Sequence, residues 1–258
     1  MTPVNIKSRG QPGNGPDGPL RAFASQPDDA PIPILHKDAA LVVVMKPSGL
    51  AVHRGWAHAP HYALDRVRDQ IGHYVWPVHR LDQATSGVLV MALTQDAASR
   101  LSGQFSDHTI DKRYLALVRG IPPEALTLDH GIALEPGEKP QRAVTHFRRL
   151  WVFERRYSLV EARPETGRRH QIRRHLKHLS CPIIGDVNYG KGEHNRLFRT
   201  RFALCRLALH ALSLTFVHPV TGLSLTVTAP LPADLAGPLA QMGCPLEALG
   251  LASAPPSI

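Results

Sequence analysis

A group of chemically active side chains stands directly before an apolar run in this sequence. Residues 79–82 read HRLD, and they are followed by the small, mostly polar residues 83–87 and by the apolar residues 88–93. The apolar run predicts a buried strand, and the residues before it predict a turn. An imidazole, a guanidinium and a carboxylate are thereby placed at the edge of a core. This layout is typical of an active site with Asp82 as nucleophile, although an aspartate here would also fit an ordinary turn.

Two distant segments supply groups that such a carboxylate needs. A nucleophilic carboxylate must be kept ionised and aimed by its neighbours, and Arg80 is too near in sequence to be its sole partner. A second source of cations is the segment TGRRHQIRRH at residues 166–175. Tyr114, in the segment KRYLALV at residues 112–118, offers a ring on which a base can stack. A tyrosine in a strand is also typical of a core residue.

The balance of charge favours a polyanionic partner. The chain has 258 residues, with 30 Lys and Arg against 21 Asp and Glu, which gives a formal net charge of +9. Six Lys or Arg residues and one Glu fall within residues 163–178, so the positive charge is concentrated there. Such a segment attracts nucleic acid through counterion release, although an acidic membrane surface would also fit.

Several classes of protein are disfavoured by the sequence. No apolar run approaches the length of a membrane span, the first residues lack a hydrophobic signal region, and three cysteines show no pairing pattern, so we expect a cytoplasmic protein with no membrane segment. His170 and His175 lie five residues apart, and no cysteine or acid completes a metal site around them. Residues 185–192 imitate a phosphate loop, but Gly192 stands where a hydroxyl must bind magnesium, so we expect no metal and no nucleotide cofactor.

The apolar and turn patterns predict a single α+β domain between two extensions. Residues 1–33 hold seven Pro and four Gly and predict a disordered tail. Residues 34–235 predict the catalytic domain, and residues 236–258 a C-terminal extension. Because strands outnumber helices and short turns connect many of them, we expect a mixed, largely antiparallel β-sheet with flanking helices and loops.

Individual elements are predicted within that domain. Strands are expected at residues 39–45, 88–93 and 113–119, and a hairpin is expected from 207–216 and 223–228. One helix is expected to begin after a Thr94 cap and to end near Phe105, and another to carry Ile172, Leu176 and Leu179 on one face. Residues 120–143 predict a long loop.

Together these segments resemble the RluA-type pseudouridine synthases, which convert uridine in RNA to its C-glycoside isomer. The likeness rests on HRLD at 79–82, KRY at 112–114 and TGR-HQ-R across 166–173. It extends to KPSG at 46–49, PIIGD at 182–186 and LHA at 209–211, and covers about residues 34–230. The resemblance implies a pseudouridine synthase-like catalytic domain. It implies no cofactor, because the isomerisation needs neither a redox step nor hydrolysis.

The resemblance also implies roles for individual residues. Asp82 corresponds to the nucleophile, Arg80 to the residue that enters the space left by the flipped base, and Tyr114 to the residue that stacks on that base. Arg173 corresponds to the residue that pairs with the aspartate, and its guanidinium fork is expected to hold both carboxylate oxygens toward the sugar. Further RNA contacts are expected from His79 and from four basic residues that would also fit a solvated face, namely Arg168, Arg169, Arg174 and Lys177.

Short segments point to one branch of the family. HRGW at 53–56, RDQIG at 68–72, the Gln83-Ala84 pair and GEHNR at 192–196 are most similar to the branch called TruC, which modifies uridine 65 of tRNA. Many relatives carry Lys-Asp after HRLD and an N-terminal S4 domain, and this sequence shows neither. We expect a monomeric enzyme that acts on tRNA. Large-subunit ribosomal RNA is the alternative substrate, and an idle RNA-binding or folding protein is the alternative class.

Overall fold

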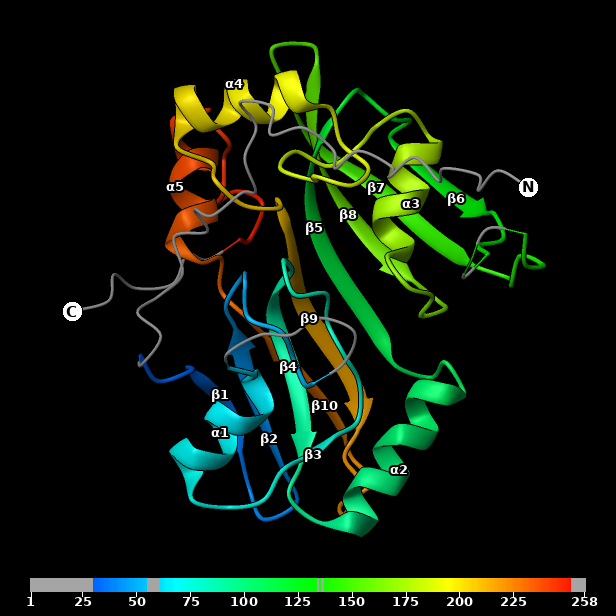
Figure 1. Ribbon diagram of the computed structural model, residues 1–258, viewed down its shortest axis with the longest axis vertical. Coiled ribbons are helices and arrows are strands. Elements are labelled where there is room, and N and C mark those ends of the chain that lie inside the picture. The colour runs from blue at the N-terminus through cyan, green and yellow to red at the C-terminus, as the bar shows by residue number, and fades with distance from the viewer. Residues whose placement is uncertain (1–29, 55–60, 134, 136, 252–258) are drawn as a thin grey trace, which may run out of the picture.

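One twisted sheet forms the frame of the molecule (Figure 1). The computed structural model describes residues 30–54, 61–133, 135 and 137–251. Within them, ten strands form a sheet in the order β1-β2-β4-β9-β5-β8-β7-β6, with β3 beside β4 and β10 beside β9, and five helices flank it. The expected α+β class is therefore confirmed. No helix of the described residues is long and apolar enough to cross a membrane.

The elements have the following bounds. The strands are β1 (Ile34–Lys37), β2 (Leu41–Lys46), β3 (Trp76–Pro77), β4 (Ser86–Ala92), β5 (Asp111–Arg119), β6 (Ala125–Asp129), β7 (Val144–Phe153), β8 (Tyr157–Pro164), β9 (Leu209–Val217) and β10 (Ser224–Thr228). The helices are α1 (Ala63–Ile71), α2 (Gln95–Ser106), α3 (Gln171–His178), α4 (Gly192–Phe202) and α5 (Ala233–Gln241).

Several predicted elements are present close to their predicted positions. The apolar runs 39–45 and 88–93 correspond to β2 and β4, which are buried along their whole length because their alternate side chains enter cores on opposite faces of the sheet. Helix α2 begins after Thr94, whose hydroxyl accepts a hydrogen bond from the Ala97 N–H at 3.2 Å. Strands β9 and β10 form the predicted hairpin.

The strand pairs are antiparallel except where β4 meets β9. These two strands run parallel for two residue pairs, Ser86 with His210 and Gly87 with Ala211, so the expected mixed sheet is confirmed. This short parallel contact connects the part of the sheet that contains strands β1–β4 to the part that contains strands β5–β8. Figure 1 shows α1 and α2 beside the lower strands and α3, α4 and α5 beside the upper ones. Residues 79–85 lead into this join and therefore lie between the two parts of the sheet.

Gly87 allows the close approach of β4 and β9. Its φ is 118°, and a Cβ at this position would lie 2.1 Å from the Ala211 carbonyl oxygen. Next to it, the Ser86 hydroxyl donates to His210 Nδ1 at 2.8 Å and accepts from Arg206 Nη2 at 2.5 Å. The join is thus closed by backbone contact and by buried polar groups that satisfy one another.

The predicted long loop at residues 120–143 is wrong in part. It contains β6, which pairs along its length with β7 and forms an edge of the sheet. The strand is mostly exposed, and only Leu126 and Leu128 pack against the hydrophobic core that β5, β7 and β8 share with α3, α4 and α5. An edge strand with two inward side chains produces too weak an alternation to be distinguished from a polar loop.

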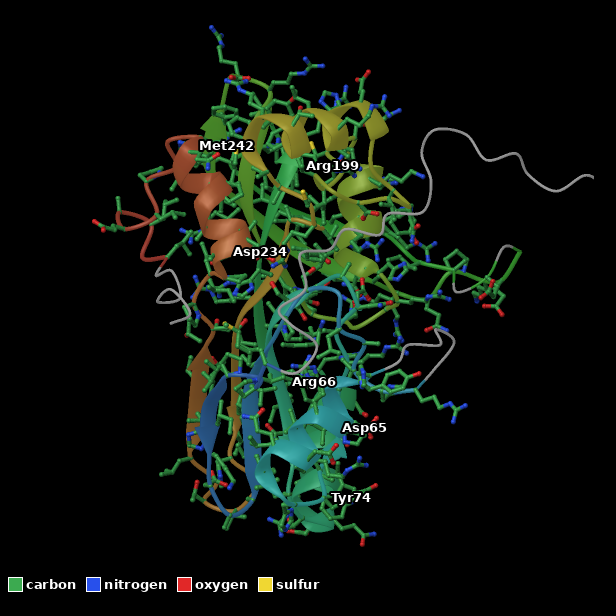
Figure 2. The ribbon with its side chains drawn as sticks, turned by 60° about the vertical axis from the view of Figure 1, so that its left-hand side comes forward. Asp65, Arg66, Tyr74, Arg199, Asp234 and Met242 are labelled. Carbon is green, nitrogen blue, oxygen red and sulfur yellow. The ribbon has the colours of Figure 1, made fainter. Side chains whose placement is uncertain are left out.

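The described domain is longer than residues 34–235. Most of the predicted tail, residues 1–29, lies outside the described residues, but Ile32 is fully buried, and the Gln70 side chain bonds both its N–H and its carbonyl. The boundary predicted after residue 235 falls inside α5, and Leu239 and Leu251 pack in the same core as Leu235. Figure 2 shows α5, with Asp234 and Met242 near its ends, against the upper part of the molecule. Residues 252–258 of the predicted extension lie outside the described residues.

The join at Gly87 gives a direct test of this architecture. Gly87→Ala is expected to lower the free energy of unfolding by at least about 3 kcal/mol, because the new methyl group must displace the Ala211 backbone and the backbone conformation is strained. The control is Gly103→Ala in α2, where nothing lies within 4 Å of the added Cβ. That change is expected to raise stability by about 0.5–1 kcal/mol. Equal denaturant midpoints for Gly87→Ala and the wild type would contradict the close approach of β4 and β9 at this position.

Candidate active site

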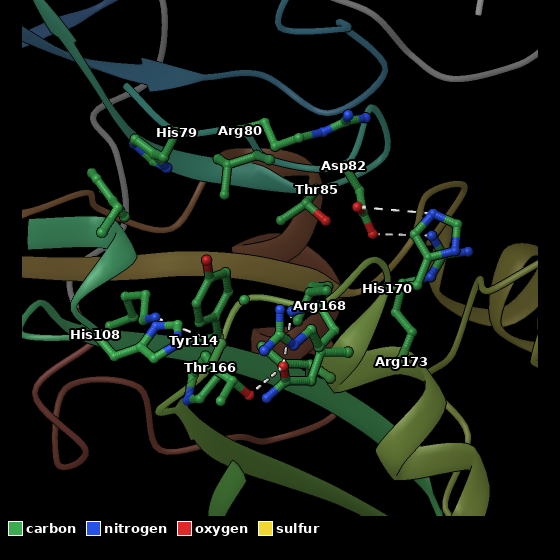
Figure 3. A pocket seen from close by; sticks show the side chains of 18 of the residues that line it. His79, Arg80, Asp82, Thr85, His108, Tyr114, Thr166, Arg168, His170 and Arg173 are labelled. Atoms are coloured by element: carbon green, nitrogen blue, oxygen red, sulfur yellow. Dashed lines mark hydrogen bonds and ion pairs between the residues drawn. The ribbon is translucent and has the colours of Figure 1, made fainter. Parts of the chain in front are cut away.

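A pocket of about 310 Å³ lies where the two parts of the sheet meet (Figure 3). Its walls come from the segment before β4, from the start of β5 and from the segment before α3. The three segments singled out in the sequence are therefore brought together in space. The residues that line the pocket include His79, Arg80, Asp82, Thr85, Phe105, His108, Lys112, Tyr114, Thr166, Arg168, His170, Gln171 and Arg173.

Asp82 and Arg173 form an ion pair in this pocket, 91 positions apart in the chain. Arg173 Nη1 donates to Asp82 Oδ2 at 3.1 Å, and 23% of the Asp82 side chain is exposed. The guanidinium fork, however, is bound to a different carboxylate. Arg173 Nε and Nη2 donate to Asp186 at 2.8 and 3.0 Å. The expectation that the fork holds both oxygens of Asp82 is therefore wrong, because Asp186 occupies it.

Asp186 fixes the position of Arg173. Its side chain is fully buried, and its Oδ1 also accepts the backbone N–H groups of Asn188 and Tyr189 at 3.0 Å each. Burial raises the pKa of Asp186, but Arg173 and these N–H groups outweigh burial and hold the pKa below its usual value. Burial likewise lowers the pKa of Arg173, and the two carboxylates outweigh it and raise that pKa. Asp82 thus faces a cation that stays charged and cannot move.

His170 is a site residue that the sequence reasoning missed. It adopts a left-handed backbone conformation with φ 55° directly before α3, which turns its ring into the pocket. Its Nε2 lies 3.9 Å from Asp82 Oδ1, and its Nδ1 lies 3.1 Å from the Tyr189 hydroxyl. Burial lowers the pKa of His170 more than the charge of Asp82 raises it. The signal available in the sequence was its place between Arg169 and Gln171 in the third motif.

Gln171 holds the segment before α3 in place. Its side-chain oxygen accepts from the Thr166 hydroxyl at 2.7 Å and from the Arg168 N–H at 3.0 Å. Its amide nitrogen donates to the Val144 carbonyl and to the Thr145 hydroxyl, both at 2.9 Å. The buried amide is therefore satisfied at both ends and ties this segment to β7.

Lys46 holds in place the turn that carries Asp82. Its Nζ is buried and donates to the carbonyls of Pro47, Leu50 and Gln83 at 2.8, 2.7 and 3.1 Å. Burial, with the charge of Arg206, lowers the pKa of Lys46 to about 7, against an opposing effect of Asp82. The residue that follows Asp82 is thereby fixed to the end of β2.

Tyr114 and Arg80 differ in how firmly they are held. Tyr114 projects from β5 into the pocket and is half-buried. Burial and the charge of Asp82 raise the pKa of its phenol, so the ring stays neutral. Arg80 is exposed, and its guanidinium makes no hydrogen bond or ion pair with any residue the structure describes. Figure 3 shows its side chain on the same side of the pocket as Asp82.

His79 and Arg174, both expected to contact RNA, are engaged inside the protein. His79 Nε2 accepts the Val90 N–H at 3.0 Å, and the ring stacks on Phe105 with centroids 4.4 Å apart. Burial and the charge of Lys112 lower the pKa of His79 to about 3, so it is not a cation at neutral pH. Arg174 Nη1 donates to the Ala133 carbonyl at 2.7 Å.

The other basic residues remain near the surface. Arg168 lines the pocket, and its Nε donates to the Arg142 carbonyl at 3.2 Å. Arg169 and Lys177 are exposed, and the Lys177 ammonium lies 5.6 Å from the centre of the Tyr189 ring. In the part of the chain that the structure describes, no group of three or more His, Cys, Asp or Glu side chains could hold a metal ion.

Comparison with known proteins shows which family the chain resembles. A family model described as RNA pseudouridylate synthase matches residues 40–178. The chain is 42% identical to the tRNA pseudouridine synthase C of Vibrio cholerae, with 81% of this chain and 95% of that protein covered. It is 43% identical to the tRNA pseudouridine synthase C of Yersinia pestis, with 81% and 90% covered.

Solved structures show the same fold. Human RNA Pseudouridylate Synthase Domain Containing 4 has a TM-score of 0.68 and 28% identity, with 82% of this chain and 93% of that chain covered. Human RNA Pseudouridylate Synthase Domain Containing 1 has a TM-score of 0.66 at 24% identity, with 90% and 100% covered. The match over residues 40–178 spans Asp82, Tyr114 and Arg173, which line the pocket. From its sequence and its fold, the chain belongs to the RluA family of RNA pseudouridylate synthases.

Proposed function

We propose that this protein is an isomerase that converts uridine to pseudouridine in tRNA. The observation that carries the proposal is Asp82, a partly exposed carboxylate held by Arg173 opposite the ring of Tyr114. The proposal is supported by membership of the family and by relatives that are named tRNA pseudouridine synthases. No cofactor is assigned.

The reaction exchanges one bond of the sugar for another. The bond between uracil N1 and ribose C1′ breaks, the base turns, and a bond forms between uracil C5 and C1′, while a proton leaves C5 and N1 gains one. In our proposal Asp82 acts as the nucleophile at the junction of sugar and base. Its Oδ1 is the available oxygen, because Oδ2 is bonded to Arg173 and the His170 ring stands 3.9 Å from Oδ1.

The size of the pocket fits a single flipped nucleoside. A volume of about 310 Å³ is at the lower end of the range for small-molecule sites and cannot admit a base pair in a helix. The target uridine must therefore leave its stack first. In our proposal Tyr114 stacks on the flipped base, and Arg80 fills the space it leaves in the RNA. The exposed Arg169 and Lys177, together with Arg168, contact phosphates.

The finer assignment concerns the place of modification. We propose uridine 65 of tRNA as the target and a cytoplasmic monomer as the active form. Pseudouridine mapping across all cellular RNA, with and without the gene, tests the substrate. Loss of a single tRNA pseudouridine at position 65 is the expected result, whereas loss of a pseudouridine in large-subunit ribosomal RNA would assign the alternative substrate.

The role of Asp82 is tested by removing its charge while keeping its shape. Asp82→Asn is expected to abolish pseudouridine formation in purified tRNA and to leave the melting temperature and the RNA affinity close to the wild type. Asp69→Asn, on the exposed face of α1, is the matched control and is expected to keep full activity. Appreciable turnover by Asp82→Asn, measured by pseudouridine content in a single-turnover reaction, would remove Asp82 as the nucleophile.

The role of Tyr114 is tested by separating its ring from its hydroxyl. Tyr114→Phe is expected to keep RNA binding, because the stacking ring remains. Tyr114→Ala is expected to weaken binding by about 1–3 kcal/mol, the usual contribution of one stacked base. Titration of both variants with tRNA provides the comparison. Equal affinity of the Phe and Ala variants would exclude Tyr114 from the base site.

The ion pair and the proposed phosphate contacts are expected to affect different kinetic quantities. Arg173→Lys keeps the charge but has a single nitrogen, which cannot replace both the fork to Asp186 and the separate nitrogen bonded to Asp82, so the single-turnover rate at saturating tRNA is expected to fall. Lys177→Ala is expected to weaken tRNA affinity and reduce the slope of log affinity against log salt by about one, with the saturated rate unchanged. If the Arg173 variant loses only affinity, the proposed function of the pair is wrong.

A further inference from the structure

Thr85 carries a buried hydroxyl that the protein leaves unpaired. Only 2% of the residue is exposed, and its Oγ1 has no hydrogen-bond partner within the described ranges. The next residue, Ser86, is equally buried, but its hydroxyl is bonded to both His210 and Arg206. Most buried polar side-chain atoms in proteins are hydrogen-bonded, so an unpaired one beside a satisfied one calls for a specific cause.

Thr85 lies at the wall of the pocket, beside Asp82. Thr85 lines the pocket, and its backbone N–H donates to the Asp82 carbonyl at 3.0 Å, so the two residues share one turn. Figure 3 shows the hydroxyl end of Thr85 facing the Asp82 carboxylate, with the Tyr114 ring on the other wall of the pocket. In the free protein this oxygen is closed to solvent at the wall of the pocket, and it faces the side on which a molecule approaches Asp82.

We propose that Thr85 Oγ1 forms a hydrogen bond with the 2′-hydroxyl of the target uridine. This inference rests on the proposed function. Asp82 must reach C1′ of the ribose, and the 2′-hydroxyl is on the neighbouring carbon, whereas the base lies against Tyr114. A threonine hydroxyl can donate and accept, as a sugar hydroxyl can, so the two groups match in either direction. The contact would also distinguish RNA from DNA, since only the 2′-hydroxyl differs at this position.

The unpaired state of Thr85 in the free enzyme has a measurable signature. Removing a hydroxyl that is hydrogen-bonded inside the protein lowers the stability of the fold. Removing a hydroxyl that bonds only the substrate leaves the stability of the fold unchanged. Removing the Thr85 hydroxyl should therefore reduce function without reducing stability. The Ser86 hydroxyl, which is used inside the protein, should behave in the opposite way.

The first experiment compares four purified variants in thermal unfolding and in single-turnover kinetics on tRNA. Thr85→Val is expected to leave the melting temperature unchanged or raise it and to lower kcat/KM by about fivefold to tenfold, the effect of one hydrogen bond. Thr85→Ser keeps the hydroxyl and is expected to restore most of this loss. Ser86→Ala is expected to lower the melting temperature. Thr200→Val, on the exposed part of α4, is the control that should match the wild type in both readouts.

The second experiment identifies the group that Thr85 bonds. Equilibrium binding is measured in the Asp82→Asn background, so that no RNA is converted, with an RNA stem-loop that carries uridine or 2′-deoxyuridine at the target position. Thr85→Val is expected to weaken binding of the uridine RNA by about fivefold to tenfold and to leave binding of the 2′-deoxyuridine RNA unchanged. An equal loss with both RNAs, or no loss with either, would overturn the contact with the 2′-hydroxyl.

The outcomes also separate this inference from the proposed function. If the wild-type protein forms pseudouridine in the RNA and Thr85→Val is as active as the wild type, only the role of Thr85 is wrong. If the wild-type protein forms no pseudouridine in tRNA or ribosomal RNA, the proposed function fails, and the inference fails with it.

Discussion

The arrangement of the site depends on one guanidinium that is shared between two carboxylates. Arg173 gives its fork to the buried Asp186 and its remaining nitrogen to Asp82. A single ion pair between exposed side chains contributes little to the stability of a fold, because two flexible side chains must be ordered in water. Here the cation is already fixed by a fully buried partner, which itself accepts two backbone N–H groups. Asp82, the proposed nucleophile, is therefore oriented by a cation that is already in place before the substrate binds.

The fold brings the two ends of this ion pair together through a short parallel contact in a sheet that is otherwise antiparallel. Strand β4 pairs with β9 at Gly87, and the other edge of β9 pairs with β5, which carries Tyr114. The turn with Asp82 is fixed to the end of β2 by Lys46, and the segment before α3 is fixed to β7 by Gln171. The turn with Asp82 and the segment before α3 are therefore each held by a separate buried polar side chain, Lys46 for the first and Gln171 for the second.

Much of this arrangement could be predicted from the sequence, because the relevant signals are local. The apolar runs of β2 and β4, the Thr94 cap and the three motifs identify the main strands, the helices α2 and α3, and the residues that meet in the pocket. What was missed depends on contacts between distant residues. Asp186 takes the fork of Arg173, and His79 bonds an N–H of β4 at Val90, next to the residues that pair with β3. Helix α5 was hidden by Gly237 and Pro238 within it, and α4 buries only a narrow stripe of His194, Phe198 and Phe202.

The contrast between Arg80 and Arg173 divides the pocket into a rigid part and a part that is free to move. The Arg80 guanidinium has no hydrogen bond or ion pair to lose within the described protein, so the movement into the RNA that we propose would cost only the freedom of its own side chain, about 2 kcal/mol. Arg173 cannot move without leaving a buried carboxylate uncompensated, which is far more costly. Under the proposed function, the RNA is therefore opened by local fluctuation of one side chain, and the ion pair between Arg173 and Asp186 does not have to break.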